Sequence, residues 1–224
     1  MKSLVSSCRQ IESLQCKAYQ LGKHHRVSFA SRHESRVSSH CHLVHSDIWG
    51  PINTPSLLGF RYFVIFVDDY SKVTYPYLMK ERSELYSIFK SFYMEIKTQF
   101  NASLHNFRSK NAHEYFHTSL SQFFYDHGII HQSSCPNTPQ QHSVAKRKMH
   151  HLLEVTRALK LQMRVPKSYW SDAILTTCHL ISHMPSTILG GQIPYIVLSP
   201  DAPLLHLPPN ISGCVLCSYL RSKK

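Results

Sequence analysis

The stretch RYFVIFVDD, residues 61 to 69, is an apolar run of aromatic and β-branched residues, the composition typical of a β-strand. A loop that contains Pro and Gly separates it from a shorter run of the same character, HLVHSDIW, residues 42 to 49. We expect these two runs to pair as a hairpin. A third run, VTYPYLM (73 to 79), contains Pro76, which lacks an N–H and is tolerated mainly at a sheet edge. This run is therefore expected to form an edge strand.

Helical and strand patterns alternate after the third run. Residues 83 to 100 have apolar side chains at 85, 88, 89, 92 and 96, the spacing of a helix packed on a sheet. Three segments follow, SLHNFRS (103 to 109) as a strand, SLSQFFYDHG (119 to 128) as a helix stopped by Gly128, and IIHQSSC (129 to 135) as a strand. Three strands followed by alternating helix and strand predict an α/β fold, with a five-stranded mixed sheet flanked by helices.

A long helix with a well-marked start is expected next. Thr138 is placed as its N-cap, Pro139 as its first residue, and Gln141 completes a capping box. The predicted buried stripe consists of Ala145, Met149, Leu152, Thr156 and Leu159. Much of the remaining surface is basic and contains Lys146, Arg147, Lys148, His150, Arg157 and Lys160. Two interpretations of this basic face stay open, contact with DNA and an ordinary solvated cationic face.

These patterns divide the chain into three parts. Residues 1–38 are polar and show no sustained period, as in a tail or the remnant of another module. Residues 39–185 are expected to form the main domain, whose last helix covers residues 168–182. Residues 186–224 are a Pro-rich tail without a clear period.

Composition favours a folded protein with a polyanionic partner. The chain has 224 residues, of which 42% are hydrophobic, enough to bury a substantial core. Its 25 Lys and Arg against 13 Asp and Glu give a net charge of +12, which favours nucleic acid, although a solvated basic surface is the alternative. No apolar run reaches the roughly 18 residues of a membrane span, and the first 15 residues lack a signal-peptide centre. The seven irregularly spaced cysteines suggest free thiols, so we expect an intracellular, reducing setting and no membrane partner.

Several longer segments carry the pattern of a family. They are CKAYQLGKHHRVSF (16 to 29), LVHSDIWGP (43 to 51), GFRYFVIFVDDYSK (59 to 72), FRSKNAHEY (107 to 115), GIIHQSSCPNTPQQHSVAKRKMHHLLEVTRALK (128 to 160) and HLISHMPSTIL (179 to 189). Together they resemble the integrase of copia-type long-terminal-repeat retrotransposons. LHLPPNISGCVLC (205 to 217) is similar to the segment that follows the integrase core in those Pol polyproteins. The resemblance covers nearly the whole chain and implies a ribonuclease-H-like fold, in agreement with the element order above.

The resemblance also implies a chemistry, phosphoryl transfer at DNA ends with two Mg²⁺ ions held by two Asp and one Glu. The first Asp corresponds to Asp47, which is present. The second lies in a family "SDNG" turn that reads SKNA here, so Lys110 replaces it. The Glu lies in a family "NGVAERK" stretch that reads HSVAKRK here, so Lys146 replaces it. Thirty-five residues separate the two lysines, a separation similar to that in the family.

Each replacement exchanges an anionic ligand for an ammonium, which cannot coordinate a metal and repels it. Asp47 alone is not expected to hold two Mg²⁺ ions. Glu154 lies about 12 Å further along the helix than Lys146, at about 1.5 Å per residue, so it is too far away to substitute. Asp68 and Asp69 are expected to lie away from the site, and Glu114 is the nearest remaining acid. We predict no metal-dependent DNA cleavage or strand transfer.

The resemblance implies a second metal site, in the amino-terminal segment. The family places a His-His-Cys-Cys zinc module before the core, with its cysteines in a CxxC stretch that reads CKAY here. Cys16 remains, Tyr19 replaces the second cysteine, and we expect the chain to start too late for the paired histidines. Structural zinc needs four N or S ligands, so the site is predicted to be broken. The histidines near Asp47, at 40, 42 and 45, suggest a metal cluster, but we favour ordinary strand histidines.

Three hypotheses for function follow. The first is a catalytically inactive integrase core, a truncated and degenerate element copy, that binds DNA nonspecifically through Lys110, Lys146, Arg147, Lys148, Arg157 and Lys160. The second is a host-adopted, non-catalytic DNA- or RNA-binding protein. The third, a nuclease that uses other carboxylates, is disfavoured by the spacing. The resemblance further implies self-association and a nuclear location if the protein is expressed.

Overall fold

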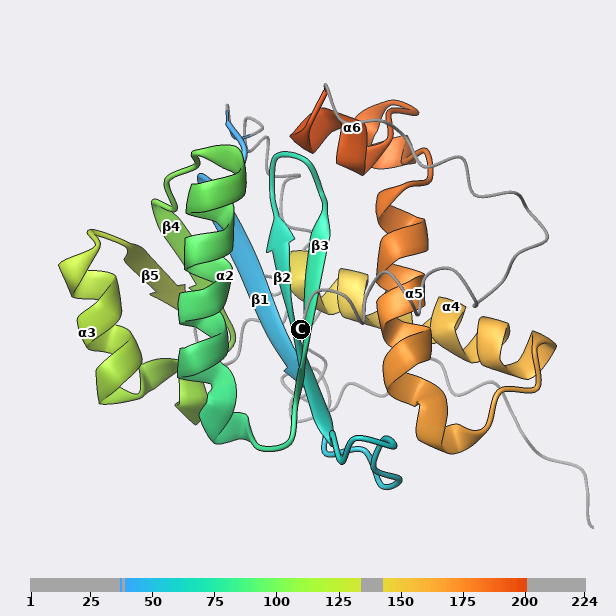
Figure 1. Cartoon of the computed structure of the whole chain (residues 1–224). Coiled ribbons are helices and arrows are strands. Elements are labelled where there is room, and N and C mark those ends of the chain that lie inside the picture. Colours follow the sequence, from blue (N-terminus) through green and yellow to red (C-terminus); the bar gives the residue numbers. More distant parts are fainter. Residues whose placement is uncertain (1–36, 38, 134–142, 201–224) are drawn as a thin grey trace, which may run out of the picture. The chain divides into compact units, whose positions relative to one another are not determined.

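Five strands form one mixed sheet in the order β3-β2-β1-β4-β5 (Figure 1). The computed structural model describes residues 37, 39–133 and 143–200, all within one unit, Arg36–Lys224. The strands are β1 (Leu43–Trp49), β2 (Tyr62–Asp68), β3 (Thr74–Met79), β4 (Asn106–Ser109) and β5 (Ile130–Ser133). The pairs β1–β2 and β2–β3 are antiparallel, and the pairs β1–β4 and β4–β5 are parallel. The predicted hairpin, the edge position of the strand with Pro76 and the five-stranded mixed sheet are confirmed.

Helices cover both faces of the sheet, α2 and α3 on one face and α4 and α5 on the other (Figure 1). The α-helices are α2 (Leu85–Phe100), α3 (Thr118–Asp126), α4 (Ser143–Gln162), α5 (Trp170–Ser182) and α6 (Pro194–Leu198). Short 3₁₀ turns precede or join them, η1 (Arg82–Glu84), η2 (His113–Phe116), η4 (Lys167–Tyr169) and η5 (Thr187–Leu189). No described helix has the length and apolar character needed to cross a membrane.

The alternation of β2 explains this two-sided packing. Val64 and Phe66 point into the cluster under α2 and α3, where Phe66 stacks on Phe92 with ring centroids 4.4 Å apart. Phe63 and Ile65 point the other way, into the cluster under α4 and α5. Because both faces of β2 are covered, the strand is apolar at successive positions instead of alternating with polar ones. The run RYFVIFVDD is therefore the centre of two cores.

Some element boundaries differ from the prediction. The fourth strand begins at Asn106, later than predicted, and the segment before it is a loop in which Ala102 and Leu104 are buried. The short helix α3 ends at Asp126, and Gly128 follows it with a φ of 65°, as predicted. Helical structure also continues past residue 185, since η5 and α6 lie in the segment expected to be an irregular tail.

Helix α4 follows its predicted stripe. Ala145, Met149, Leu152 and Thr156 are buried, whereas Leu159 is half-buried. The predicted cap at Thr138 lies outside the described residues, as do the amino-terminal zinc segment with Cys16 and the carboxy-terminal residues from 201 onwards.

Candidate functional site

Asp47 lies on the central strand β1 and is nearly inaccessible, with a side chain 4% exposed. Because β1 and β4 are parallel with His45 opposite Arg108, two further residues along each strand bring Asp47 beside Lys110. The Lys110 Nζ donates a hydrogen bond to Asp47 Oδ2 at 2.6 Å. A buried carboxylate requires a partner, and in this protein the partner is the ammonium of Lys110.

The third corner of the expected site lies at the same place. Lys146 is exposed and belongs to the first turn of α4, which the buried Ala145 anchors against the sheet. A small surface pocket at this point is lined by His45, Ser46, Arg108, Ser109, Lys110, Ala145 and Lys146. The structure therefore brings Lys110 and Lys146 together at the end of β4, beside Asp47.

These residues do not fit a Mg²⁺ site. One oxygen of Asp47 is already bonded to an ammonium, and Lys110 and Lys146 provide no lone pair to a metal while protonated. Within residues 37, 39–133 and 143–200, no three His, Cys, Asp or Glu side chains are grouped as metal ligands.

Glu114, which we expected to be the nearest alternative acid, is bonded elsewhere. Arg82 donates through Nη1 to Glu114 Oε1 at 2.9 Å and through Nη2 to the Gly50 carbonyl at 3.1 Å. Burial by itself raises the pKa of Glu114, but the hydrogen bond and the charge of Arg82, together with a backbone hydrogen bond and the neighbouring His113, lower it overall. Glu114 thus ties η2 to η1 and does not line the pocket. Glu154, exposed further along α4, does not line it either.

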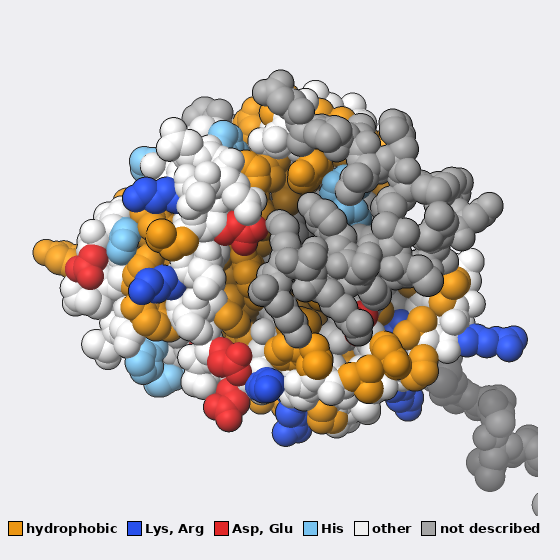
Figure 2. All heavy atoms as spheres, viewed as in Figure 1, with side chains coloured by type: hydrophobic (Ala, Val, Ile, Leu, Met, Phe, Trp, Pro, Cys, Tyr) orange, Lys and Arg blue, Asp and Glu red, His pale blue; other side chains and the backbone are white. Residues whose placement is uncertain are grey.

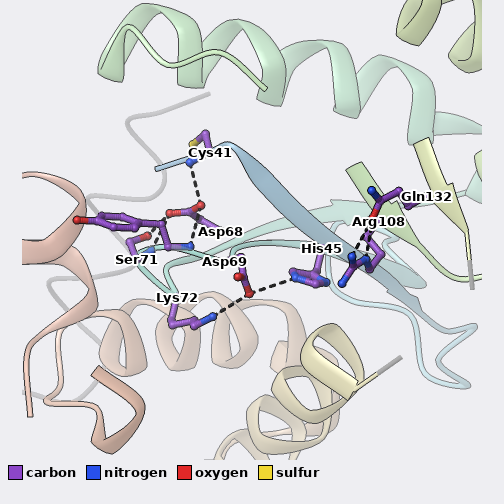
Figure 3. A network of polar contacts seen from close by, with 9 residues as sticks. Cys41, His45, Asp68, Asp69, Ser71, Lys72, Arg108 and Gln132 are labelled. Carbon is purple, nitrogen blue, oxygen red and sulfur yellow. Dashed lines mark hydrogen bonds and ion pairs between the residues drawn. The ribbon is translucent and has the colours of Figure 1, made fainter. Parts of the chain in front are cut away.

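Asp68 and Asp69 hold the turn after β2 (Figure 3). Asp68 lies opposite Val44 in the sheet and accepts hydrogen bonds from the Cys41 N–H at 2.9 Å and from the Ser71 hydroxyl at 2.6 Å. Its position confirms that it lies away from Asp47 along the strand. Asp69 is connected to the pocket indirectly, through the ring of His45.

The contact between Asp69 and His45 was not predicted from the sequence. His45 Nε2 is 3.2 Å from Asp69 Oδ1, and the same oxygen accepts a hydrogen bond from Lys72 Nζ at 2.8 Å. Burial by itself raises the pKa of Asp69, but the bonds to His45 and Lys72 lower it below its usual range. Figure 3 shows His45 between Asp69 and Arg108. The histidines near Asp47 do not converge, since His42 stacks on His105 and the ring of His40 contacts the Phe100 carbonyl.

Arg108 is the charged residue of the pocket that we did not predict. It lies on β4, where its Nε and Nη2 donate to Gln132 Oε1 of β5 at 3.1 and 2.8 Å (Figure 3). Its signal was present in the sequence. Arg108 and Lys110 are two residues apart at a strand end, and this spacing places side chains on the same face.

The basic residues of α4 differ in their exposure. Arg147 and Arg157 are exposed, whereas Lys148 is half-buried, and burial lowers its pKa in the neighbourhood of Cys178 on α5. Lys160 donates to the Lys167 carbonyl at 3.3 Å near the other end of the helix. On the molecular face that Figure 2 shows, the Lys and Arg side chains are scattered, mostly singly, among other side chains. Of the predicted nucleic-acid contacts, only Lys110 and Lys146 line the pocket.

The fold is shared with retroviral integrase catalytic cores, although no family model matches the chain. The HTLV-2 integrase catalytic core domain in complex with magnesium (trimeric form) has a TM-score of 0.52 at 10% identity, over 70% of this chain and 96% of that one. The catalytic core domain of BIV integrase has a TM-score of 0.51 at 16% identity, over 72% of this chain and 95% of that one. The simian T-cell lymphotropic virus intasome in complex with PP2A regulatory subunit B56 gamma has a TM-score of 0.57 at 13% identity. The match covers 78% of this chain and 60% of that one. The chain therefore has the ribonuclease-H-like fold of an integrase catalytic core.

In sequence, the chain is similar to retrotransposon Pol polyproteins. The Retrovirus-related Pol polyprotein from transposon TNT 1-94 of Nicotiana tabacum is 34% identical over 214 residues, which is 95% of this chain and 16% of the polyprotein. The corresponding polyprotein from transposon RE2 of Arabidopsis thaliana is 31% identical over 216 residues, which is 93% of this chain and 14% of the polyprotein. The chain is thus similar to a part of copia-type retrotransposon Pol polyproteins and spans 14–16% of the length of these two.

Proposed function

We propose that this chain is an integrase core that has lost metal-dependent DNA cleavage and joining and that binds DNA nonspecifically. The observation that carries the proposal is the hydrogen bond of 2.6 Å from Lys110 Nζ to Asp47 Oδ2. The remaining carboxylate of the expected metal site is occupied by an internal cation, and the pocket beside it has a second lysine at residue 146.

The electrostatic cost of a metal at this position supports the proposal. A divalent ion about 4 Å from one ammonium is repelled by on the order of 8 kcal/mol at an effective dielectric constant of about 20. Lys110, 38% exposed, relieves this repulsion only by leaving Asp47, which breaks the ion pair. Magnesium is present in the HTLV-2 core, but the ligand set in this chain does not favour it.

DNA binding is the part of the integrase activity that needs no metal. The chain carries 25 Lys and Arg and a net charge of +12, so contacts to phosphates are expected to dominate its affinity. A protein that binds chromosomal DNA acts in the nucleus, so we propose a nuclear location for this chain. We also propose that the chain self-associates, which would place several DNA-binding surfaces on one DNA molecule.

The test is an assay of DNA end processing and joining by the purified chain with Mg²⁺ or Mn²⁺, together with DNA binding over a series of salt concentrations. We expect no joined product above a reaction with EDTA. We also expect log affinity to fall linearly with log salt, with a slope near −0.9 for each phosphate contacted. Joining that depends on metal and is abolished by Asp47→Asn contradicts the loss of catalysis. Absence of binding at low salt contradicts DNA binding.

A second candidate is a host-adopted binding protein without catalysis. It is favoured by the pairing of Lys110 with Asp47, because the exchange has not left a buried carboxylate without a partner. If this candidate holds, the purified chain should unfold cooperatively and bind nucleic acid reproducibly. An unfolded or aggregating product would instead favour simple decay of the element copy.

A further inference from the structure

We propose that the pocket at the ends of β1 and β4 is a metal-independent site for a single phosphate group, either a phosphate of a DNA strand or free phosphate. The inference rests on the proposed function in that both require the pocket to have lost its metal. It adds the chemical identity of the occupant, which is an anion where the integrase chemistry requires cations.

Cationic groups from two elements meet at the pocket. Arg108 and Lys110 lie at the end of β4, two residues apart, and Lys146 reaches the pocket from α4. This arrangement depends on the parallel pairing of β1 with β4 and on the burial of Ala145 and Met149, which fix α4 against the sheet. The cations are therefore held by the fold and are not gathered on a mobile tail.

The charge around the pocket is not balanced. Asp47 offsets the charge of Lys110, and Asp69 faces His45 and Lys72. Arg108, in contrast, is bonded to the neutral amide of Gln132, and no described carboxylate pairs with Arg108 or Lys146. Two positive charges remain, which match the charge of about −1.5 to −2 on free phosphate or a terminal phosphate near neutral pH and exceed the single charge of an internal phosphodiester.

The donors that remain free also suit a phosphate. Gln132 takes the Nε and Nη2 donors of Arg108, which leaves further N–H groups of the guanidinium for bidentate contact with phosphate oxygens. Lys110 uses one N–H for Asp47 and retains others. The two serine hydroxyls of the pocket are already bonded, Ser46 to Tyr115 at 2.6 Å and Ser109 to His131 at 2.8 Å. The nitrogen donors are thus the ligands of the anion.

Removing the Asp47 carboxylate has opposite effects on a metal site and on a phosphate site. In a metal site, removing the carboxylate weakens the site. In a phosphate site, Asp47 is the described anion that competes with the ligand for Lys110, so Asp47→Asn frees the ammonium and removes a repulsion. We expect phosphate to bind at least threefold more tightly to Asp47→Asn than to the wild type.

The test uses the full-length chain in EDTA. Fluorescence anisotropy follows the binding of labelled single-stranded oligonucleotides that carry a 5′-phosphate or a 5′-hydroxyl, and inorganic phosphate is added as competitor. We expect phosphate to displace both oligonucleotides. We expect about tenfold weaker competition in Arg108→Gln and in Lys146→Gln, since each variant loses a hydrogen bond to a charged group. The control is Lys97→Gln, which removes the same charge from an exposed position on α2, on the other face of the sheet.

The arms of the experiment distinguish the sources of the phosphate. Tighter binding of the 5′-phosphorylated oligonucleotide assigns the pocket to a terminal phosphate, and equal binding with full competition assigns it to an internal one. If the Arg108 and Lys146 variants behave like Lys97→Gln, or if Asp47→Asn weakens competition while the protein stays folded by circular dichroism, the phosphate site is wrong. Salt-dependent DNA binding would survive that result, so this inference and the proposed function fail separately.

Discussion

The ion pair between Lys110 and Asp47 is expected to stabilise the fold, and a double-mutant cycle measures by how much. Exposed pairs contribute about 0.2–1 kcal/mol, whereas removing one partner of a fully buried pair costs about 3–5 kcal/mol. Asp47 is 4% exposed and Lys110 is 38% exposed, so the pair lies between these limits. We expect Lys110→Met to lower the free energy of unfolding by about 2 kcal/mol.

The cycle consists of Lys110→Met, Asp47→Asn and the double variant, each unfolded in urea. Because the amide at position 47 of the double variant carries no charge that needs a cationic partner, we expect the double variant to be about 1–2 kcal/mol more stable than the sum of the single effects predicts. Lys146→Met is the matched control, since it removes an exposed ammonium that pairs with no described carboxylate, and it should change stability by less than about 0.5 kcal/mol. Additive single effects within about 0.5 kcal/mol would refute the coupling, provided that the urea slopes are equal.

Three further predictions concern buried or bonded groups. Burial and the neighbouring His183 lower the pKa of His179 to about 4, so the unfolded chain binds more protons below about pH 6.5. The free energy of unfolding should therefore decrease as the pH falls from about 6.5 to 4. In urea titrations, His179→Phe should make this decrease smaller, and an unchanged dependence on pH would contradict the role of His179. Burial raises the pKa of Cys178 to about 12, so peptide mapping should find it alkylated by iodoacetamide only after unfolding, and labelling of the folded protein would count against this burial. Arg82→Met should cost about 1 kcal/mol, since Glu114 loses its partner, without any change in DNA affinity; a loss of affinity would place Arg82 at the interface.

The sheet was predictable because its strands carry strong local signals. The strand run at 61–69 is apolar on both faces, and Pro76 on the next run limits that strand to an edge. Exact boundaries were less predictable. Leu104 has a residue type that suits a strand, but it lies in the loop before β4. Its apolar side chain is buried in the core without strand pairing, and sequence alone does not separate these two cases.

The sequence predicted which residues lie at the site, but not the contacts that they make. The sequence identified Lys110 and Lys146 as replacements for carboxylates, and the structure places both at one pocket. The ion pair with Asp47 depends on the parallel register of β1 and β4, which joins residues 63 positions apart and leaves no local trace in the sequence. The burial of Lys148 was missed for a related reason. A helical pattern shows which residues share a face. It does not show that a neighbouring helix, here α5, covers the part of α4 that carries Lys148.

The most direct test of the central claim is calorimetric titration of Mn²⁺ into the wild type, Lys110→Asp, and the double variant Lys110→Asp/Lys146→Glu. The account predicts no binding heat for the wild type and measurable binding for the double variant, because three carboxylates then meet at the end of β4. Lys110→Asp alone should bind more weakly than the double variant. Wild-type binding as tight as that of the double variant, and lost in Asp47→Asn, would contradict the claim that lysine has replaced the metal.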